Sequence, residues 1–169
     1  LVLTNDNEYT TYNCRYAIFA TGGIGRVYEY TTNSAIATGD GITIAHELGA
    51  EIRNLSYIQF HPTGFNNKHT RETFLISESV RGEGAYLKNC NGERFMQNYD
   101  DRLELAPRDV VSHAIMAEAK KTGSDKFYLD ITHKDPEFVR NRFPMINEKL
   151  LEAGYDMTKD MIPIFPCHH

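Results

Sequence analysis

The sequence predicts an α+β fold, in which short strands and separate helices follow one another without an internal repeat. Two segments carry this prediction. Residues 1–4 and 9–12 are rich in β-prone residues and flank a turn-forming NDNE tetrad, which indicates a hairpin. Residues 106–123 are typical of a helix that has Pro107 in its first position and Gly123 after its last turn.

Further segments complete the predicted order. Residues 16–20 form a continuous apolar run, which is typical of a buried strand. Residues 42–48 place apolar side chains on one helical face and predict a helix that ends at a glycine. Residues 51–60 alternate loosely and predict a strand that leads into a His61-Pro62 turn. The remaining predicted elements are a hairpin around residues 89–92, a strand at 128–130, helices at 136–143 and 145–153, and an extended segment at 162–165.

The composition limits the function classes. The formal net charge of -5 leaves no domain-wide basic surface to neutralise nucleic-acid phosphates, so we predict no nucleic-acid partner. No apolar run approaches the roughly 20 residues of a membrane helix, so we predict no membrane span. Three widely spaced cysteines, Cys14, Cys90 and Cys167, indicate reduced thiols in a cytoplasmic protein. The histidines lack the spacing of a metal site, so no metal is predicted.

Both ends of the sequence suggest an excerpt from a longer protein. The chain opens on Leu1 inside a strand-like run, and it closes on His168 and His169 after an apolar segment. Two terminal histidines are also typical of a tag remnant.

Residues 59–84 contain the densest group of candidate functional side chains. The group consists of His61, Thr63, Ser77, Glu78 and Arg81. Together these residues supply hydrogen-bond donors, a cation and a carboxylate, which suits the binding of a small anion and the movement of a proton beside it. The structural alternative is a common His-Pro turn and a solvent-exposed helical ion pair of little energetic worth. The density of these side chains favours the functional interpretation.

A pair of glycines follows the apolar run at residues 16–20, in the sequence Thr21-Gly22-Gly23. A buried strand that ends in two glycines allows the backbone to approach a bound phosphate or ring. Most Gly-Gly pairs are plain turns, so this signal is weak by itself.

Two charged residues at predicted helix starts have both a structural and a functional interpretation. Asp40 stands where an N-cap belongs, while its carboxylate also suits the hydroxyl groups of a cofactor; spacing alone favours the cap. Arg108 lies in a first helical turn, where a cation faces the positive end of the helix dipole. Arg108 either turns away and pairs with Asp109 or Glu104, or is held in this position for a function.

The motifs HPTG, SESVRGEG and APRDVV follow one another in the chain, after ATGG and TGDGI. Together they resemble the succinate dehydrogenase/fumarate reductase flavoprotein superfamily, and within it most closely the L-aspartate oxidases. QFHPT, RGEGAYL, GERFM, LAPRD, FYLDITHK and IPIFPCHH are similar to the family's motifs and keep its order. LAPRD after a short connector, together with LDITHK, favours the oxidases. The resemblance covers essentially the whole chain.

The resemblance implies a domain organisation. Residues 1–54 are similar to the last part of an FAD-binding α/β segment, and residues 55–169 to the capping, substrate-binding domain of a fumarate reductase-like flavoprotein. FAD is therefore the implied cofactor. The family's dinucleotide fingerprint and its C-terminal segment that returns to the flavin are not in this sequence, so the isolated chain is expected to be inactive.

The resemblance also implies roles for individual residues. The implied catalytic residues are Arg108, Arg81 and Glu78, which form the family's proton path. The implied substrate-binding residues are His61, Thr63, Ser77 and His169. The implied cofactor-binding residues are Thr21, Gly22, Gly23, Asp40 and Gly41. For Asp40 the resemblance thus reverses the preference for a mere cap. Crowding of Arg108 by Arg81 and by the helix dipole is hypothesised to let Arg108 exchange a proton through Glu78.

A protein of this kind is expected to oxidise L-aspartate to iminoaspartate, with oxygen or fumarate as the final electron acceptor. The product would pass to quinolinate synthase for NAD biosynthesis. The expected ligands are L-aspartate and other C4 dicarboxylates such as fumarate and succinate. Two alternatives stay open: the flavoprotein subunit of a succinate dehydrogenase or fumarate reductase, and a non-catalytic dicarboxylate-binding capping module.

Overall fold

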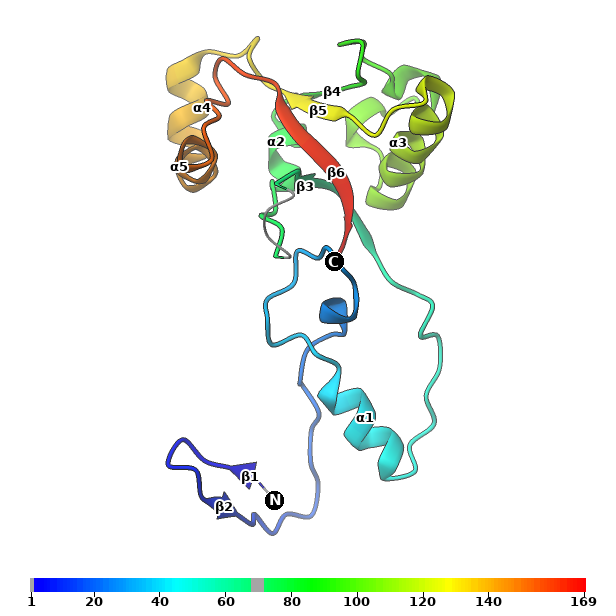
Figure 1. Cartoon of the computed structure of the whole chain (residues 1–169), viewed down its shortest axis with the longest axis vertical. Helices are drawn as coiled ribbons and strands as arrows, with labels where there is room; N and C mark the ends of the chain where they lie inside the picture. Colours follow the sequence, from blue (N-terminus) through cyan, green and yellow to red (C-terminus); the bar gives the residue numbers. More distant parts are fainter. Residues whose placement is uncertain (1, 68–71) are drawn as a thin grey trace.

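A four-stranded antiparallel sheet forms the centre of the fold (Figure 1). The computed structural model describes residues 2–67 and 72–169 of the chain. The strands lie in the order β3 (Phe60–Phe65), β6 (Ile162–His168), β5 (Phe127–Asp130) and β4 (Tyr86–Lys88). The last strand of the sequence is therefore a central strand. In β6, Cys167 pairs with His61 of β3, and Ile162 pairs with Leu129 of β5.

Helices lie on both sides of this sheet. Figure 1 shows α3 (Arg108–Thr122) on one side and α4 (Pro136–Arg142) and α5 (Pro144–Glu152) on the other. The short helix α2 (Glu78–Gly82) follows β3, and two turns of 3-10 helix, η2 (Met96–Asn98) and η3 (Leu103–Leu105), lead from β4 to α3. None of the described helices is long and apolar enough to cross a membrane.

The hydrophobic core lies between the sheet and these helices. Its most deeply buried side chains include Ile76, Leu87, Ile115, Leu129 and Ile164, each at most 2% exposed. Burying one such side chain stabilises a fold by roughly 1.5–3 kcal/mol. The core brings α3 next to β3 and η3 next to α2, so the start of α3 lies close enough to α2 for Arg108 to reach Glu78.

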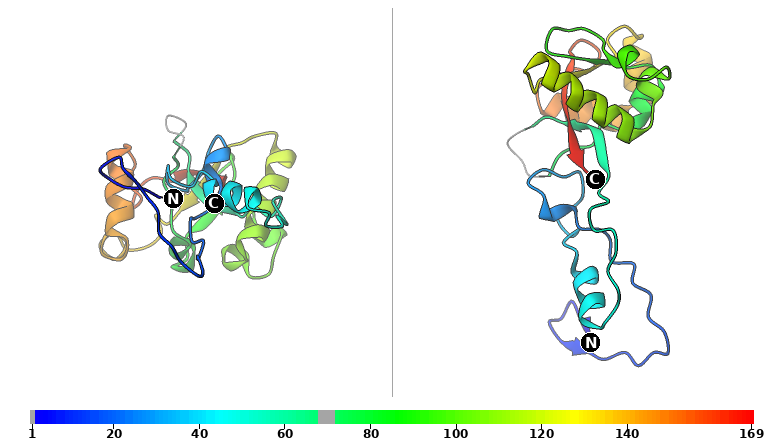
Figure 2. Two further views of the ribbon diagram at one scale, coloured as in Figure 1. Left: turned by 90° about the horizontal axis from the view of Figure 1, so that it is seen from below. Right: turned by 90° about the vertical axis from the view of Figure 1, so that its right-hand side faces the viewer.

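The first part of the chain, residues 2–58, extends away from the sheet as an N-terminal arm (Figures 1 and 2). The arm carries the hairpin of β1 (Val2–Leu3) and β2 (Tyr9–Thr10), the 3-10 turn η1 (Gly25–Val27) and the helix α1 (Asp40–Glu47). One segment of the arm returns to the end of β6. There the ring of Tyr28 stacks on the ring of His168 with centroids 3.7 Å apart, and Thr31 Oγ1 donates to the carbonyl of His168.

Most predicted elements are confirmed. The N-terminal hairpin, the helix after Gly39, the strand at β5 and the two helices separated by Pro144 occur where the sequence places them. The turn at residues 89–92 is confirmed by a hydrogen bond from Gly92 N to Asn89 O and by the positive φ of 77° at Gly92. The extended segment near the C-terminus is confirmed and is longer than predicted, because it forms the central strand β6.

Two predicted strands are wrong. Residues 16–20 form no strand, because no other described segment lies beside them to pair with; Tyr16 is 80% and Ile18 is 93% exposed. Residues 51–58 are also irregular, and the strand begins only at Phe60. His61 and Pro62 consequently lie inside β3 rather than in a turn. Pairing with β6 explains the difference, since a partner strand decides which residues adopt extended pairing.

Two predicted helix starts shift by one residue. Gly39, with a φ of 81°, is the N-cap of α1, and Asp40 is its first helical residue without a side-chain capping bond. The cap prediction for Asp40 is therefore wrong, and its carboxylate lies near the helix N-terminus instead. Pro107 is the N-cap of α3 rather than its first residue, so Arg108 opens the helix.

Candidate active site

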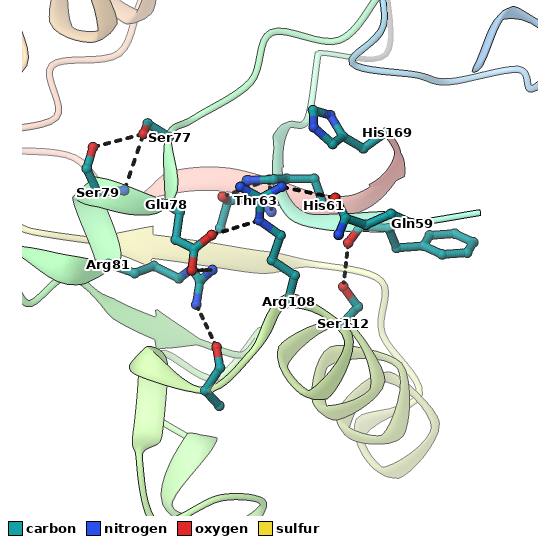
Figure 3. Close-up of polar contacts among 12 residues, drawn as sticks. Gln59, His61, Thr63, Ser77, Glu78, Ser79, Arg81, Arg108, Ser112 and His169 are labelled. Carbon is teal, nitrogen blue, oxygen red and sulfur yellow. Dashed lines mark hydrogen bonds and ion pairs between the residues drawn. The ribbon is translucent and has the colours of Figure 1, made fainter. Parts of the chain in front are cut away.

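Five of the predicted site residues come together where β3, α2 and the start of α3 meet (Figure 3). They are His61 and Thr63 from β3, Glu78 and Arg81 from α2, and Arg108 from α3. We call these five residues the site cluster. His169, directly after β6, lies beside the cluster, with its ring centroid 5.6 Å from that of His61. The five residues of the site cluster therefore all come from β3, α2 and α3, and none comes from the N-terminal arm.

Glu78 lies between the two arginines of the cluster. Arg108 Nε donates to Glu78 Oε2 over 2.7 Å, and Arg81 Nη2 is 3.5 Å from Glu78 Oε1. The hydrogen bond from Arg108 holds the pKa of the Glu78 carboxyl below its usual value. The alternative in which Arg108 pairs with Asp109 or Glu104 is wrong. Helix α2 sets the spacing of Glu78 and Arg81, because residues three apart share one helical face.

Arg81 is a buried cation with unused donors. It is 1% exposed, and its Nη1 donates to the carbonyl oxygens of Glu104 and Ala106. Its Nε and Nη2 have no hydrogen-bond partner among the described residues. Burial lowers the pKa of the guanidinium from its usual value, because desolvation disfavours the charged form. A buried guanidinium with free N–H groups suits the binding of a carboxylate.

His61 is buried and neutral. It is 0% exposed, and Thr63 N donates to its Nδ1 over 3.3 Å, so the ring proton belongs on Nε2. Nε2 has no partner among the described residues and is therefore an available donor. Burial, followed by the charge of Arg108, lowers the pKa of His61 to about 3. Thr63 Oγ1 donates to the carbonyl of Ile76 over 2.8 Å. Thr63 is thereby held in place, and its backbone N–H orients the His61 ring.

The buried His61 predicts a dependence of stability on pH. Its pKa is 6.5 in an unfolded chain and about 3 in the fold, so the unfolded chain binds more protons between these values. The free energy of unfolding should consequently fall as the pH is lowered from about 6.5 toward 3. We expect the variant His61→Gln to lose about 2–3 kcal/mol less than the parent protein between pH 7 and pH 4. Urea unfolding at both pH values measures this difference, and equal losses would contradict a neutral His61.

Three further residues complete the surroundings of the cluster. Gln59 Oε1 accepts from Arg108 Nη1 over 3.0 Å, and the carbonyl of Gln59 accepts from His169 N. Thr32 Oγ1 lies 2.7 Å from His169 Nδ1. Ser77 is the N-cap of α2, and its Oγ accepts from both the backbone N–H and the hydroxyl of Ser79, away from the two arginines (Figure 3).

Gln59 and Thr32 are not among the site residues predicted from the sequence. Gln59 had a usable signal, because it directly precedes β3 and lies only two residues before His61 in the chain. Thr32 had none, since its partner His169 is 137 residues away in the chain. A groove of about 720 Å³ opens beside Arg108 and Gln59, also lined by Phe60, Pro107 and Ser112. This volume is in the range of small-molecule sites.

The predicted cofactor-binding residues form a second group in the N-terminal arm, around the start of α1. Gly41 packs directly on Thr21, since a Cβ at Gly41 would lie 1.8 Å from Thr21 Oγ1. Gly39 N donates to the carbonyl of Gly23 over 3.1 Å. A Cβ at Gly22 or Gly23 would meet nothing within 4 Å, so this backbone is open on one side. An open glycine backbone beside a helix N-terminus suits the polar groups of a dinucleotide such as FAD.

Known proteins are similar to this chain over most of its length. The whole chain, residues 1–169, matches the family model of the FAD binding domain. It is 51% identical over 159 residues to the L-aspartate oxidase of Yersinia pestis, covering 94% of this chain and 30% of that protein. It is 46% identical over 165 residues to the L-aspartate oxidase of Vibrio cholerae, covering 98% of this chain and 31% of that protein.

A solved structure of quinol fumarate reductase from Escherichia coli is similar to the fold, with a TM-score of 0.81 and 37% identity. This match covers 89% of the present chain and 28% of the reductase chain. The chain thus spans about 30% of the length of its curated relatives. The similarity confirms a mixed helix and sheet fold of the fumarate reductase flavoprotein type, and the family model confirms FAD as the cofactor. The chain belongs to the FAD binding domain family.

Proposed function

We propose that this chain is part of an FAD-dependent L-aspartate oxidase that acts in the cytoplasm. In this proposal, residues 1–54 are the end of the first FAD-binding segment and residues 55–169 are the capping, substrate-binding domain. The observation that carries the proposal is the site cluster, in which buried donors of His61 and Arg81 have no partner among the described residues. Identities of 46% and 51% to two L-aspartate oxidases support the choice of substrate.

The cluster suits a C4 dicarboxylate such as L-aspartate, fumarate or succinate. Such a molecule has two anionic ends, and each needs directional donors when it leaves water. His61 Nε2 and His169 are placed to hold one carboxylate, with the Ser77 hydroxyl as a further donor if it turns from Ser79. Arg81 offers Nε and Nη2 to the other carboxylate. Thr63 contributes by fixing the tautomer and orientation of His61.

The arginines and Glu78 would also move protons. Oxidation of L-aspartate to iminoaspartate removes a hydride from Cα and a proton from the amino group, and bound FAD would supply the two-electron acceptor. Arg108 is placed to take or give the substrate proton, since its Nε and Nη1 are fixed by Glu78 and Gln59 while Nη2 stays available. Glu78 would accept that proton from Arg108, and Arg81, whose Nη2 lies beside the same carboxylate, would relay it by releasing one of its own protons as it gains one.

The second group would hold the polar part of FAD. Thr21, Gly22 and Gly23 would offer backbone and hydroxyl groups, and Asp40 and Gly41 would present the N-terminus of α1. Reduced FAD would be reoxidised by oxygen or by fumarate, and the iminoaspartate product would be consumed by quinolinate synthase.

An anaerobic titration of the full-length, flavin-loaded protein tests the proposal. We expect L-aspartate to bleach the flavin absorbance and succinate to leave it unchanged. Bleaching by succinate alone would instead favour a succinate dehydrogenase or fumarate reductase flavoprotein, the alternative supported by the fold similarity to quinol fumarate reductase. Binding of a dicarboxylate without bleaching in either titration would favour a non-catalytic binding module.

A further inference from the structure

Glu104 is a buried carboxylate outside the site cluster, and its backbone carbonyl contacts Arg81 of the cluster. Glu104, in η3, is 3% exposed and accepts three hydrogen bonds. Arg94 donates to it with Nε over 2.9 Å and with Nη2 over 2.6 Å, and the backbone N–H of Leu87 donates over 3.1 Å. The carboxylate therefore joins η3 to β4 and to the hairpin that follows β4.

The same short segment holds Arg81. The carbonyl oxygens of Glu104 and Ala106 are the acceptors of Arg81 Nη1. These two contacts leave Nε and Nη2 of Arg81 without a hydrogen-bond partner among the described residues, and they keep Nη2 within ion-pair distance of Glu78. Arg108 begins α3 only two residues after Ala106. The backbone of residues 104–106 thus determines the direction of the Arg81 side chain and the position of Arg108 at the start of α3.

The turn η3, which leads into this segment, needs contacts from the surrounding structure to hold its conformation. Leu103 has a φ of 55°, in the left-handed region that costs a non-glycine residue about 1–2 kcal/mol. Such a conformation persists only when surrounding contacts fix it. The charge-assisted bonds from Arg94 to Glu104 are the strongest such contacts, because paired N–H groups bind a carboxylate in one orientation.

We infer that Glu104 is a positioning residue for the proposed proton path. Its side chain, clamped by Arg94 and Leu87 N, fixes the carbonyl groups that hold the Arg81 guanidinium against Glu78. This inference rests on the proposed function for its kinetic consequences, but the placement of Arg81 is independent of any activity. The simpler alternative is a buried ion pair that only supports the fold. That alternative gives no role to the two carbonyl contacts with Arg81.

The variant Glu104→Gln separates the two possibilities in the full-length, flavin-loaded protein. It keeps the size of the side chain but sets an amide against Arg94, so the segment should shift and release Arg81. We expect the rate of flavin reduction at saturating substrate to fall about 10²-fold and the KM to rise, because Arg81 both shares the proposed proton path and offers donors to a substrate carboxylate. The alkaline limb of the rate profile should also move to higher pH, because desolvation is the main cause that lowers the pKa of Arg81 and a displaced guanidinium loses that burial.

Glu118→Gln is the matched control. Glu118 is a buried carboxylate at 1% exposure, bonded to Asn89 Nδ2 over 3.0 Å and to Tyr99 OH over 2.8 Å, without a contact to either cluster arginine. We expect Glu118→Gln to destabilise the fold to a similar degree and to leave the rate within about twofold and the pH profile in place. Equal effects of both substitutions on rate and profile would overturn the inference.

A crystal structure of the full-length Glu104→Gln protein provides a readout without activity. We expect the Arg81 guanidinium to have left the carbonyl oxygens of Glu104 and Ala106. Arg81 in its parental position, with a parental rate, would overturn the inference and leave the proposed function intact. A displaced Arg81 in a protein that turns over no dicarboxylate would support the positioning role of Glu104 while the proposed function fails.

Discussion

Replacing Arg108 with lysine is expected to reduce flavin turnover with L-aspartate about 10³-fold, which corresponds to about 4 kcal/mol on the barrier. Lysine keeps the positive charge. It loses the fork that lets one guanidinium contact Glu78 through Nε and Gln59 through Nη1 while a third nitrogen is left for the proposed substrate. The free energy of unfolding should change by less than about 1 kcal/mol, because the Arg108 side chain is 32% exposed.

Anaerobic stopped-flow reduction of the flavin measures this rate, and urea unfolding measures the stability. Arg102→Lys is the control, since Arg102 makes a similar forked pair with Asp100 at the surface. We expect the control to turn over at the parental rate. A rate near the parental value for Arg108→Lys would show that charge alone suffices and would remove Arg108 from the proton path.

Replacing Arg81 with methionine is expected to reduce turnover about 10²- to 10³-fold while changing the free energy of unfolding by less than about 2 kcal/mol. Two stability effects oppose each other. The substitution leaves the carbonyl groups of Glu104 and Ala106 without their donor, which destabilises the fold. It also removes a desolvated guanidinium whose Nε and Nη2 have no hydrogen-bond partner among the described residues, which stabilises the fold.

The comparison of activity with stability decides what Arg81 is for. Steady-state turnover and urea unfolding are measured on the same preparation, with Arg140→Met as a control for loss of a helical arginine away from the cluster. A large loss of stability, above about 3 kcal/mol, with activity retained in the folded fraction would make Arg81 a structural residue. The expected pattern, lost activity in a stable protein, is typical of a residue kept for function at some cost to the fold.

Local patterns in the sequence were sufficient for most elements and for parts of the site. Helix spacing predicts that Glu78 and Arg81 share one face, and α2 places both residues in this way. The motifs that resemble flavoproteins predict FAD, which the family match confirms. The roles of the individual site residues remain predictions that the variants above test.

Local patterns failed where a distant partner decides the conformation. The apolar run at residues 16–20 has strand-like composition but no neighbouring strand, whereas His61-Pro62 reads as a turn yet becomes extended because β6 pairs with it. Asp40 and Pro107 were misplaced by one residue for a different reason. Several neighbouring backbone conformations can begin a helix, and packing selects among them.

By itself, the sequence determined which donors, carboxylates and glycines are present and how those on one element are spaced, because the period of a helix or strand fixes neighbouring side chains. Only the tertiary structure decided that Arg108 pairs with Glu78, 30 residues away, and that Glu104 supports Arg81 through its carbonyl. It alone also decided that His61 and Arg81 are buried, which shifts their pKa values. Burial and long-range pairing depend on how β3, α2 and α3 pack together, and no local spacing encodes that packing.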